Sequence, residues 1–245
     1  MRIDLKAPTC WTELTTEQLR SVVEMATKEL GREEFLLVAF CLFANIKMVA
    51  GTAMEDGKKV VRTRFKTADG TVFELEDWQL RDFCERLSFL FEEEIPLDAA
   101  WPFRWNRYLM DTSFGDWFHA DALLLGYGMS GDLEQIKGAM KDLGDPHYDL
   151  QPNDPDVVLM LKWYEQFKNW LLGRYPSVFH SSGSESEPSS PVDARRNIML
   201  MLNNGHPQDN EAIENAKMHD VLAALQHKVE EAKHIEDQMK KMKYK

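Results

Sequence analysis

A run of ten consecutive apolar residues, 35–44, most constrains how this chain can fold. The run is apolar on every side of a helix, so the helix must be surrounded by other parts of the protein. It is also too short to cross a bilayer, because a membrane-spanning helix needs about 20 apolar residues. We therefore predict that residues 32–43 form a central core helix of a soluble protein.

Helical periodicity and end signals predict several further helices around this one. Thr15 or Thr16 can cap a first helix, with Glu17 and Gln18 close behind, and Gly31 ends the apolar repeat. Pro155 suits the first turn of another helix. The remaining helices are expected at residues 76–92, from Ser113, at 132–143, at 156–172 and around 195–202, and a long helix is expected from the turn at 203–207 to the end of the chain.

One β-hairpin interrupts the helical pattern. Residues 58–65 are β-branched and partly alternating, Asp69-Gly70 is a strong tight-turn signal, and residues 71–75 form a return strand. A two-stranded hairpin is marginal in water, so it must pack on a helix or pair with another strand.

The serine-rich segment 181–191 divides the predicted fold. Such a segment cannot bury enough apolar surface to offset its ordering entropy, so we predict a flexible linker. The prediction is a mainly α protein with a helical body at 1–180, its hairpin near 58–75, and a C-terminal helical arm at 192–245.

Charge and cysteine content limit the partners and the compartment. The formal charge is −12, and since residues 217–245 carry seven lysines and five acids, residues 1–216 carry −14. This acidity argues against nucleic acid and against an anionic membrane surface, and it favours a protein partner. Three widely separated cysteines and the absence of an apolar signal core at the start indicate a cytoplasmic protein with reduced thiols.

The candidate chemical groupings are sparse, so we predict a non-enzymatic protein without cofactor or metal. Asp116, His119 and Asp121 resemble an acid–base group, and an enzyme of unknown class with a site there is the alternative. Gly126, Gly128 and Gly131 spell a dinucleotide fingerprint, but they follow a helical run instead of a strand. The pair Glu231 and His234 has di-iron spacing, although a second pair is missing.

The C-terminal helix carries an apolar heptad repeat, with a lysine at 228 and a small alanine at 232. The repeat predicts a protein-binding surface, and methionine suits adaptable contacts. Docking of this helix on the protein's own body and self-association remain open alternatives. The predicted partner-binding residues are Met218, Val221, Leu225, Ile235, Met239 and Met242.

Two segments add a family resemblance. Residues 11–19, WTELTTEQL, are similar to the start of small accessory proteins encoded near tail genes of phages and prophages, including tail assembly chaperones. Residues 112–121, TSFGDWFHAD, resemble a recurring segment of prophage proteins. The resemblance implies a helical assembly factor that engages tail components, in the cytoplasm of a bacterial host or on the virion, and it assigns no binding residues.

Overall fold

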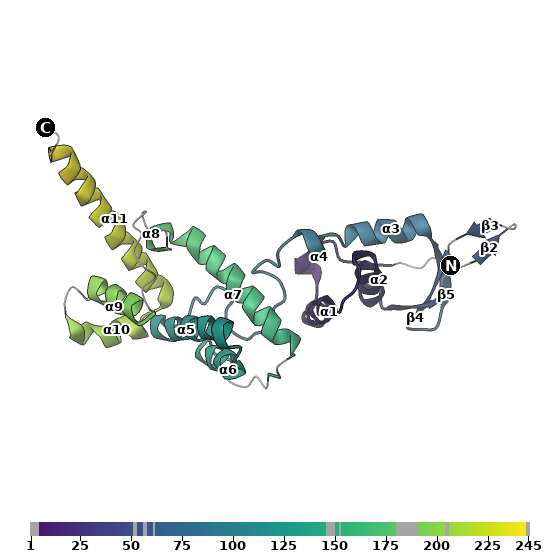
Figure 1. The fold of residues 1–245 in the computed structure, drawn as a ribbon, viewed down its shortest axis with the longest axis horizontal. Helices are drawn as coiled ribbons and strands as arrows, with labels where there is room; N and C mark the ends of the chain where they lie inside the picture. Colours follow the sequence, from purple (N-terminus) through teal and green to yellow (C-terminus); the bar gives the residue numbers. More distant parts are fainter. Residues whose placement is uncertain are drawn as a thin grey trace. The chain divides into compact units, whose positions relative to one another are not determined.

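The computed structural model describes residues 5–50, 53–55, 58–60, 62–145, 150–151, 153–179, 191–203 and 206–243. The chain is mainly helical with a small antiparallel sheet, as predicted (Figure 1). It divides into two compact units, residues 1–102 and 103–245, which we call unit 1 and unit 2. The division therefore falls near Pro102, and the predicted body at 1–180 does not form a single unit.

The predicted linker and the predicted arm both fall within unit 2. Of the linker residues 181–191, only Pro191 lies within the described residues, where it begins a helix. The predicted arm at 192–245 belongs to unit 2 together with the helices that precede the linker. The arm is thus not a separate domain, because its helices supply part of the unit 2 core.

The helices of unit 1 follow the sequence signals closely at their starts. The Thr15 hydroxyl accepts a hydrogen bond from the Gln18 amide while the Gln18 side chain accepts one from the Thr15 amide, which completes the predicted capping box. The elements are η1 (Trp11–Glu13), α1 (Thr16–Ala26), α2 (Arg32–Phe43), α3 (Asp77–Arg86) and α4 (Phe89–Glu92).

Helix α2 packs one side into the core of unit 1, whereas the apolar run predicted a helix surrounded on every side. Ala39 and Phe40 are fully buried, whereas Val38 and Leu42 on another side of the helix remain about two-fifths exposed. The helix is therefore a core helix on one side only.

The predicted hairpin is present and belongs to a larger sheet. Strand β4 (Arg62–Thr67) pairs antiparallel with β5 (Val72–Glu76), and Gly70 in the turn has φ of 90°. A strand that the sequence analysis missed, β1 (Ile46–Ala50), pairs with the other edge of β4. The predicted first strand is also divided, since residues 58–60 form β3, which pairs with β2 (Ala53–Glu55) in a separate ribbon.

The three-stranded sheet packs one face against α2. Ile46, Phe65 and Leu75 are buried, while alternate residues such as Arg64 and Glu74 are exposed. The Phe65 ring lies edge-on to Phe40 of α2, with centroids 5.9 Å apart. This contact supplies the packing that the hairpin needs.

The single helix predicted at 76–92 is wrong, because it breaks at Leu87 between α3 and α4. Leu87 and Phe89 are both buried. In one continuous helix these two residues would point in nearly opposite directions, so the break allows both side chains to enter the core. Trp11 contacts Phe89 edge-on at this position.

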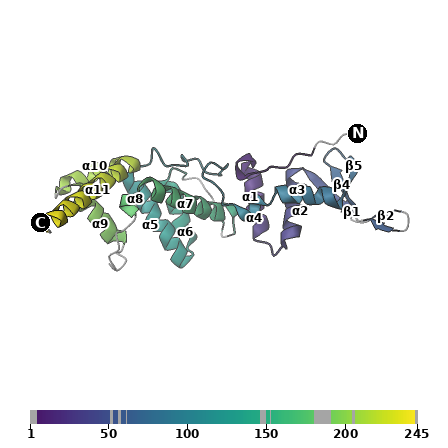
Figure 2. The same cartoon turned by 90° about the horizontal axis from the view of Figure 1, so that it is seen from above.

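The helices of unit 2 pack together without a β-strand in the part that the structure describes, and Figure 2 shows them side by side. Trp163 is fully buried at its centre and stacks on Phe167, with ring centroids 5.3 Å apart. Its elements are α5 (Phe114–Ser130), α6 (Leu133–Asp142), α7 (Pro155–Arg174), α8 (Pro176–Phe179), α9 (Pro191–Leu202), η2 (Pro207–Asp209), α10 (Asn210–Asn215) and α11 (Met218–Lys243).

The glycine triplet at 126–131 serves helix geometry. Gly126 and Gly128 lie inside α5, and Gly131 ends that helix in the left-handed conformation at φ of 67°. Asp132 then caps α6 by accepting a hydrogen bond from the Glu134 amide. The triplet lies within and at the end of a helix, so it lacks the strand–turn–helix setting of a dinucleotide site.

Candidate protein-interaction surface

The first turn of α11 is anchored in unit 2 by a buried histidine. One ring nitrogen of His219, Nε2, lies 2.6 Å from the Tyr108 carbonyl oxygen and must donate its proton to it. The other nitrogen, Nδ1, lies 2.9 Å from the Tyr175 hydroxyl, which also donates to the His219 carbonyl oxygen at 3.4 Å. In addition, the Met218 amide donates to the Thr112 carbonyl. These bonds fix where α11 begins and in which direction it runs.

The first half of the predicted heptad seam packs inside unit 2. Met218, Val221 and Leu225 are each at most 5% exposed. In this structure these three side chains pack within their own chain, and their role in partner binding stays a prediction. The alternative that the sequence left open, docking on the protein's own body, holds for this half of the helix, since it contacts α5, α8 and α9.

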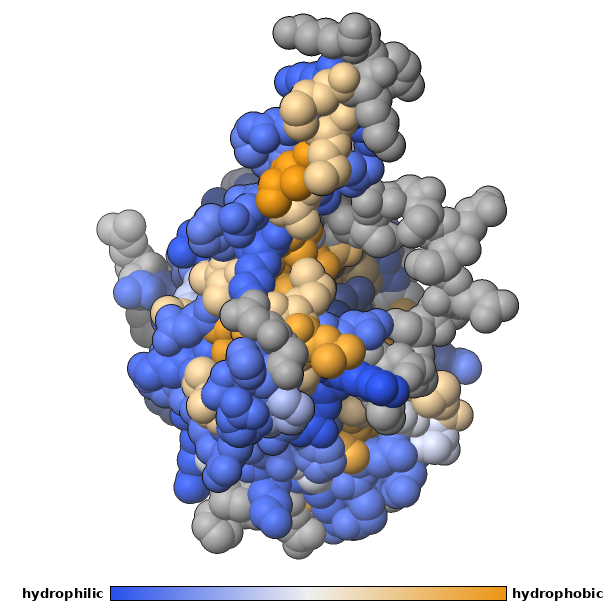
Figure 3. All heavy atoms as spheres, turned by 90° about the vertical axis from the view of Figure 1, so that its left-hand side faces the viewer, coloured by the Kyte–Doolittle hydropathy of each residue, from blue (hydrophilic) through white to orange (hydrophobic). Residues whose placement is uncertain are grey.

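The second half of the seam is exposed. Every α11 residue from Glu230 to Met242 is exposed, including Ile235 at 47%, Met239 at 57% and Met242 at 69%. Together with Ala232, these residues repeat at alternating spacings of three and four, so they lie on one face of the helix. We call Ala232, Ile235, Met239 and Met242 the distal stripe. Figure 3 shows apolar side chains running along the protruding helix toward the body of unit 2.

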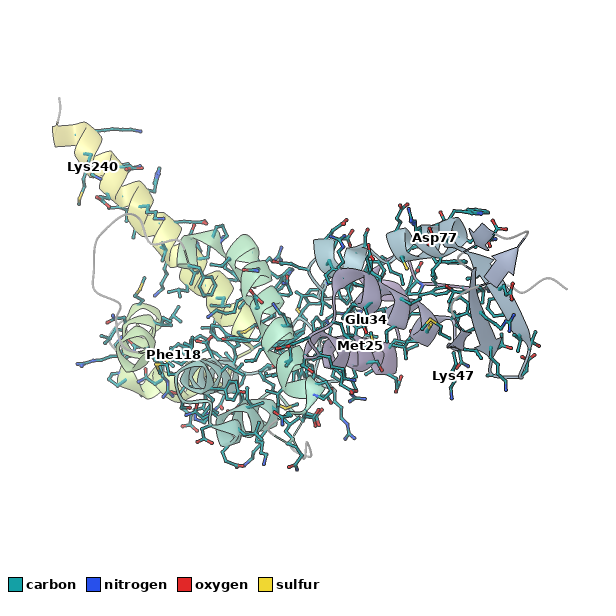
Figure 4. All side chains as sticks on the ribbon, turned by 45° about the vertical axis from the view of Figure 1, so that its right-hand side comes forward. Met25, Glu34, Lys47, Asp77, Phe118 and Lys240 are labelled. Carbon is teal, nitrogen blue, oxygen red and sulfur yellow. The ribbon has the colours of Figure 1, made fainter. Side chains whose placement is uncertain are left out.

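The distal stripe is flanked by charges that are segregated along the helix. Residues 230–237 contain four acids and one lysine, whereas residues 238–245 contain four lysines and no acid. Lys240 lies on the protruding part of α11 (Figure 4) and bridges Glu236 one turn earlier at 2.7 Å. The surface is thus an apolar stripe with an acidic first half and a basic second half.

Asp116, His119 and Asp121 do not converge, although all three lie on α5. Asp116 bonds to the Ser113 hydroxyl at the helix start, and His119 pairs with Asp142 of α6 at 2.7 Å while two-thirds of its side chain stays exposed. The third residue, Asp121, pairs with Lys168 of α7 at 2.9 Å. Each of the three side chains thus pairs with a different residue, and these partners come from three different places in unit 2.

The groups that resemble metal ligands are also dispersed. Glu231 and His234 both lie on the exposed part of α11, and the Nε2 of His234 faces the Gln238 side chain. Among the described residues, no cluster of three or more His, Cys, Asp or Glu side chains could hold a metal ion.

An open groove of about 710 Å³ lies between α2 and α3 of unit 1. Leu36, Leu80 and the Cys84 thiol form apolar parts of its lining, and Arg81 and Glu33 are among its charged residues. Burial raises the pKa of the Cys84 thiol above its ordinary value, and the nearby Glu33 carboxylate raises it further. A protonated thiol among leucines and mixed charges is not arranged as a nucleophile.

Comparison with known proteins assigns no relative. The chain matches no protein-family model, and it matches neither a curated protein nor a solved structure. Among the described residues, no helix combines the length and the apolar character that crossing a membrane requires. The distal stripe is therefore the candidate interaction site on the basis of its geometry. The heptad repeat was the sequence pattern that pointed to it.

Proposed function

We propose that this chain is a non-enzymatic assembly or structural accessory protein that acts through protein–protein contacts made by the distal stripe. The observation that carries the proposal is the division of one apolar seam into a buried half and an exposed half. Contiguous exposed apolar surface with a polar border is typical of interaction sites. The separation of Asp116, His119 and Asp121 supports the non-enzymatic part.

The biological setting that we propose is the tail region of a phage or prophage. It is supported by the resemblance of segments 11–19 and 112–121, and places the protein in the bacterial cytoplasm or on the virion. Each of the two segments contributes a buried tryptophan to the core, Trp11 in the first and Trp117 in the second. The resemblance therefore supports the class of protein, whereas the distal stripe supports the mode of action.

The test is co-expression of the chain with the proteins encoded beside it, followed by affinity purification. The variant Ile235→Glu/Met239→Glu places charge in the distal stripe and should lower capture of a tail-region partner at least about tenfold, since interface hot spots contribute 2 kcal/mol or more each. Met129→Glu is the matched control, because Met129 is 87% exposed elsewhere in unit 2. Equal capture by all three proteins would reject the role of the stripe.

Deleting residues 192–245 is not a clean test of this proposal. That deletion removes Met218, Leu222 and Leu225 from the core of unit 2. A chain that ends at Val229 removes only the exposed part of α11 and is the appropriate truncation.

A further inference from the structure

We propose that the distal stripe binds the distal stripe of a second copy of this chain, with the two α11 helices antiparallel. The inference rests on the proposed function, because it names the partner of the same surface. Four features of α11 support it. They are the continuity of the stripe with the buried half of the heptad row, the absence of a hinge, the segregation of charge and the length of the exposed part.

The distal stripe continues the heptad row of the buried half of α11. The exposed residues continue, at unchanged heptad spacing, the row whose earlier members Val221 and Leu225 are buried against other helices. A face that is packed against helices in its first half is suited in shape and periodicity to another helix in its second half.

The described helices of unit 2 leave the stripe uncovered while α11 remains one helix. Helix α11 is continuous from Met218 to Lys243 and contains neither glycine nor proline, so it has no built-in hinge. Its first turn is fixed by the hydrogen bonds of His219. A second molecule is therefore the occupant that we propose for the stripe.

Charge segregation favours a second copy in the antiparallel direction. Residues 230–237 carry a net charge of −3 and residues 238–245 carry +4. Antiparallel pairing sets the acidic half of each helix beside the basic half of the other, whereas parallel pairing sets like halves together and brings Glu231 close to Glu236 of the second copy.

One like-charge contact remains in the antiparallel arrangement. In the register that layers Ala232 on Met242 and Ile235 on Met239, Glu236 meets its own counterpart near the twofold axis. Each Glu236 is already bridged to Lys240 of its own helix at 2.7 Å, which offsets the repulsion.

The exposed length fits the same register. Residue 243 of one helix lies level with residue 231 of the other, so each helix tip reaches the point where the partner's α11 enters its own unit 2. The uninterrupted exposed part of α11 begins at Glu230. The antiparallel register therefore covers the full distal stripe. In this register residue 243 of one helix reaches the edge of the other copy's unit 2 and does not extend past it.

The first experiment measures molar mass by sedimentation equilibrium of the full chain from roughly 1 to 500 μM, a range suited to a weak association through two heptads. Wild type and Met129→Glu should rise from 28.4 kDa toward twice that value. Ile235→Glu/Met239→Glu should stay monomeric, or dissociate at least tenfold more readily. A monomeric wild type at the highest concentration overturns the inference but leaves the proposed function standing if a different protein is captured.

The second experiment determines direction with nitroxide labels and pulsed electron resonance distances. A label at residue 230 should lie about 21 Å along the axis from its counterpart in an antiparallel pair, since 14 residues separate them at 1.5 Å each. A label at residue 237 should lie level with its counterpart and serves as the control. Short distances at both positions would show a parallel pair and overturn the antiparallel assignment. Unchanged dimerisation of Ile235→Glu/Met239→Glu would place the interface elsewhere and overturn the inference as a whole.

Discussion

The hydroxyl of Tyr175 lies 2.9 Å from Nδ1 of His219, which joins the end of α7 to the first turn of α11. Both residues are buried. The direction in which α11 leaves unit 2, and hence the exposure of the distal stripe, depends on this contact.

Replacing Tyr175 by Phe should lower the free energy of unfolding by about 1–3 kcal/mol, because the buried Nδ1 of His219 loses its hydrogen-bond partner. Urea unfolding followed by tryptophan fluorescence measures the change. The control is Tyr164→Phe, since the buried Tyr164 hydroxyl has no hydrogen-bond partner among the described residues. That variant should be neutral or slightly stabilising. Equal losses in both variants would contradict the importance of the Tyr175 hydroxyl.

The two halves of α11 should respond differently to truncation of an apolar side chain. Leu222 is 1% exposed, so Leu222→Ala should cost about 2–5 kcal/mol of unfolding free energy through lost burial and a cavity. Met239 is 57% exposed, and Met239→Ala in dilute monomeric protein should change stability by less than about 0.5 kcal/mol. A large loss for Met239→Ala under those conditions would show that the stripe packs on its own chain.

Burial makes the thiol of Cys41 unreactive at neutral pH. Burial raises its pKa from 9.0 to about 11, so at pH 8 the folded protein holds roughly 100-fold less thiolate at this position than the unfolded chain. Iodoacetamide labelling of Cys41, followed by peptide mass spectrometry, should therefore be slow in buffer and fast in denaturant. The rate in the folded protein should keep rising up to about pH 11. Rapid labelling at pH 8 that levels off below pH 9 would contradict this account.

The ion pair between Glu236 and Lys240 should give the end of α11 a defined pH dependence. Lys240 lowers the pKa of the Glu236 carboxyl below its ordinary 4.5, and Glu236 raises the pKa of the Lys240 amine above 10.5. Because the pKa of Glu236 is lowered, the ion pair stabilises the end of α11 above pH 4.5, and this stabilisation is lost as the pH falls through the lowered pKa. A raised base pKa means that it is present below pH 10.5 and is lost as the pH rises through the raised value.

Amide hydrogen exchange of residues 236–243, corrected for the intrinsic pH dependence, measures this support. Wild type should protect these amides more than Glu236→Gln does at neutral pH, and the difference should vanish as the pH falls well below 4.5. A difference that persists in acid would mean that the glutamate acts by something other than its charge.

Local signals in the sequence determined most of the helix starts and the hairpin. Thr15, Ser113 and Asp132 cap helices through contacts within three residues, and Asp69 and Gly70 shape a turn of their own. Such interactions are complete within one turn of chain, so the sequence alone predicts them. The apolar run at 35–44 likewise had to become a core helix.

The tertiary structure decided what the same local patterns could not. The predicted helix 76–92 is two helices, and the break between them allows Leu87 and Phe89 both to be buried in the core. Strand β1 forms by pairing with the edge of β4 that β5 leaves open. The heptad row of α11 is uniform in sequence, yet Leu225 is buried and Ile235 exposed. Burial depends on which distant helices reach a position, and a periodic pattern states only that a face is apolar, not what covers it.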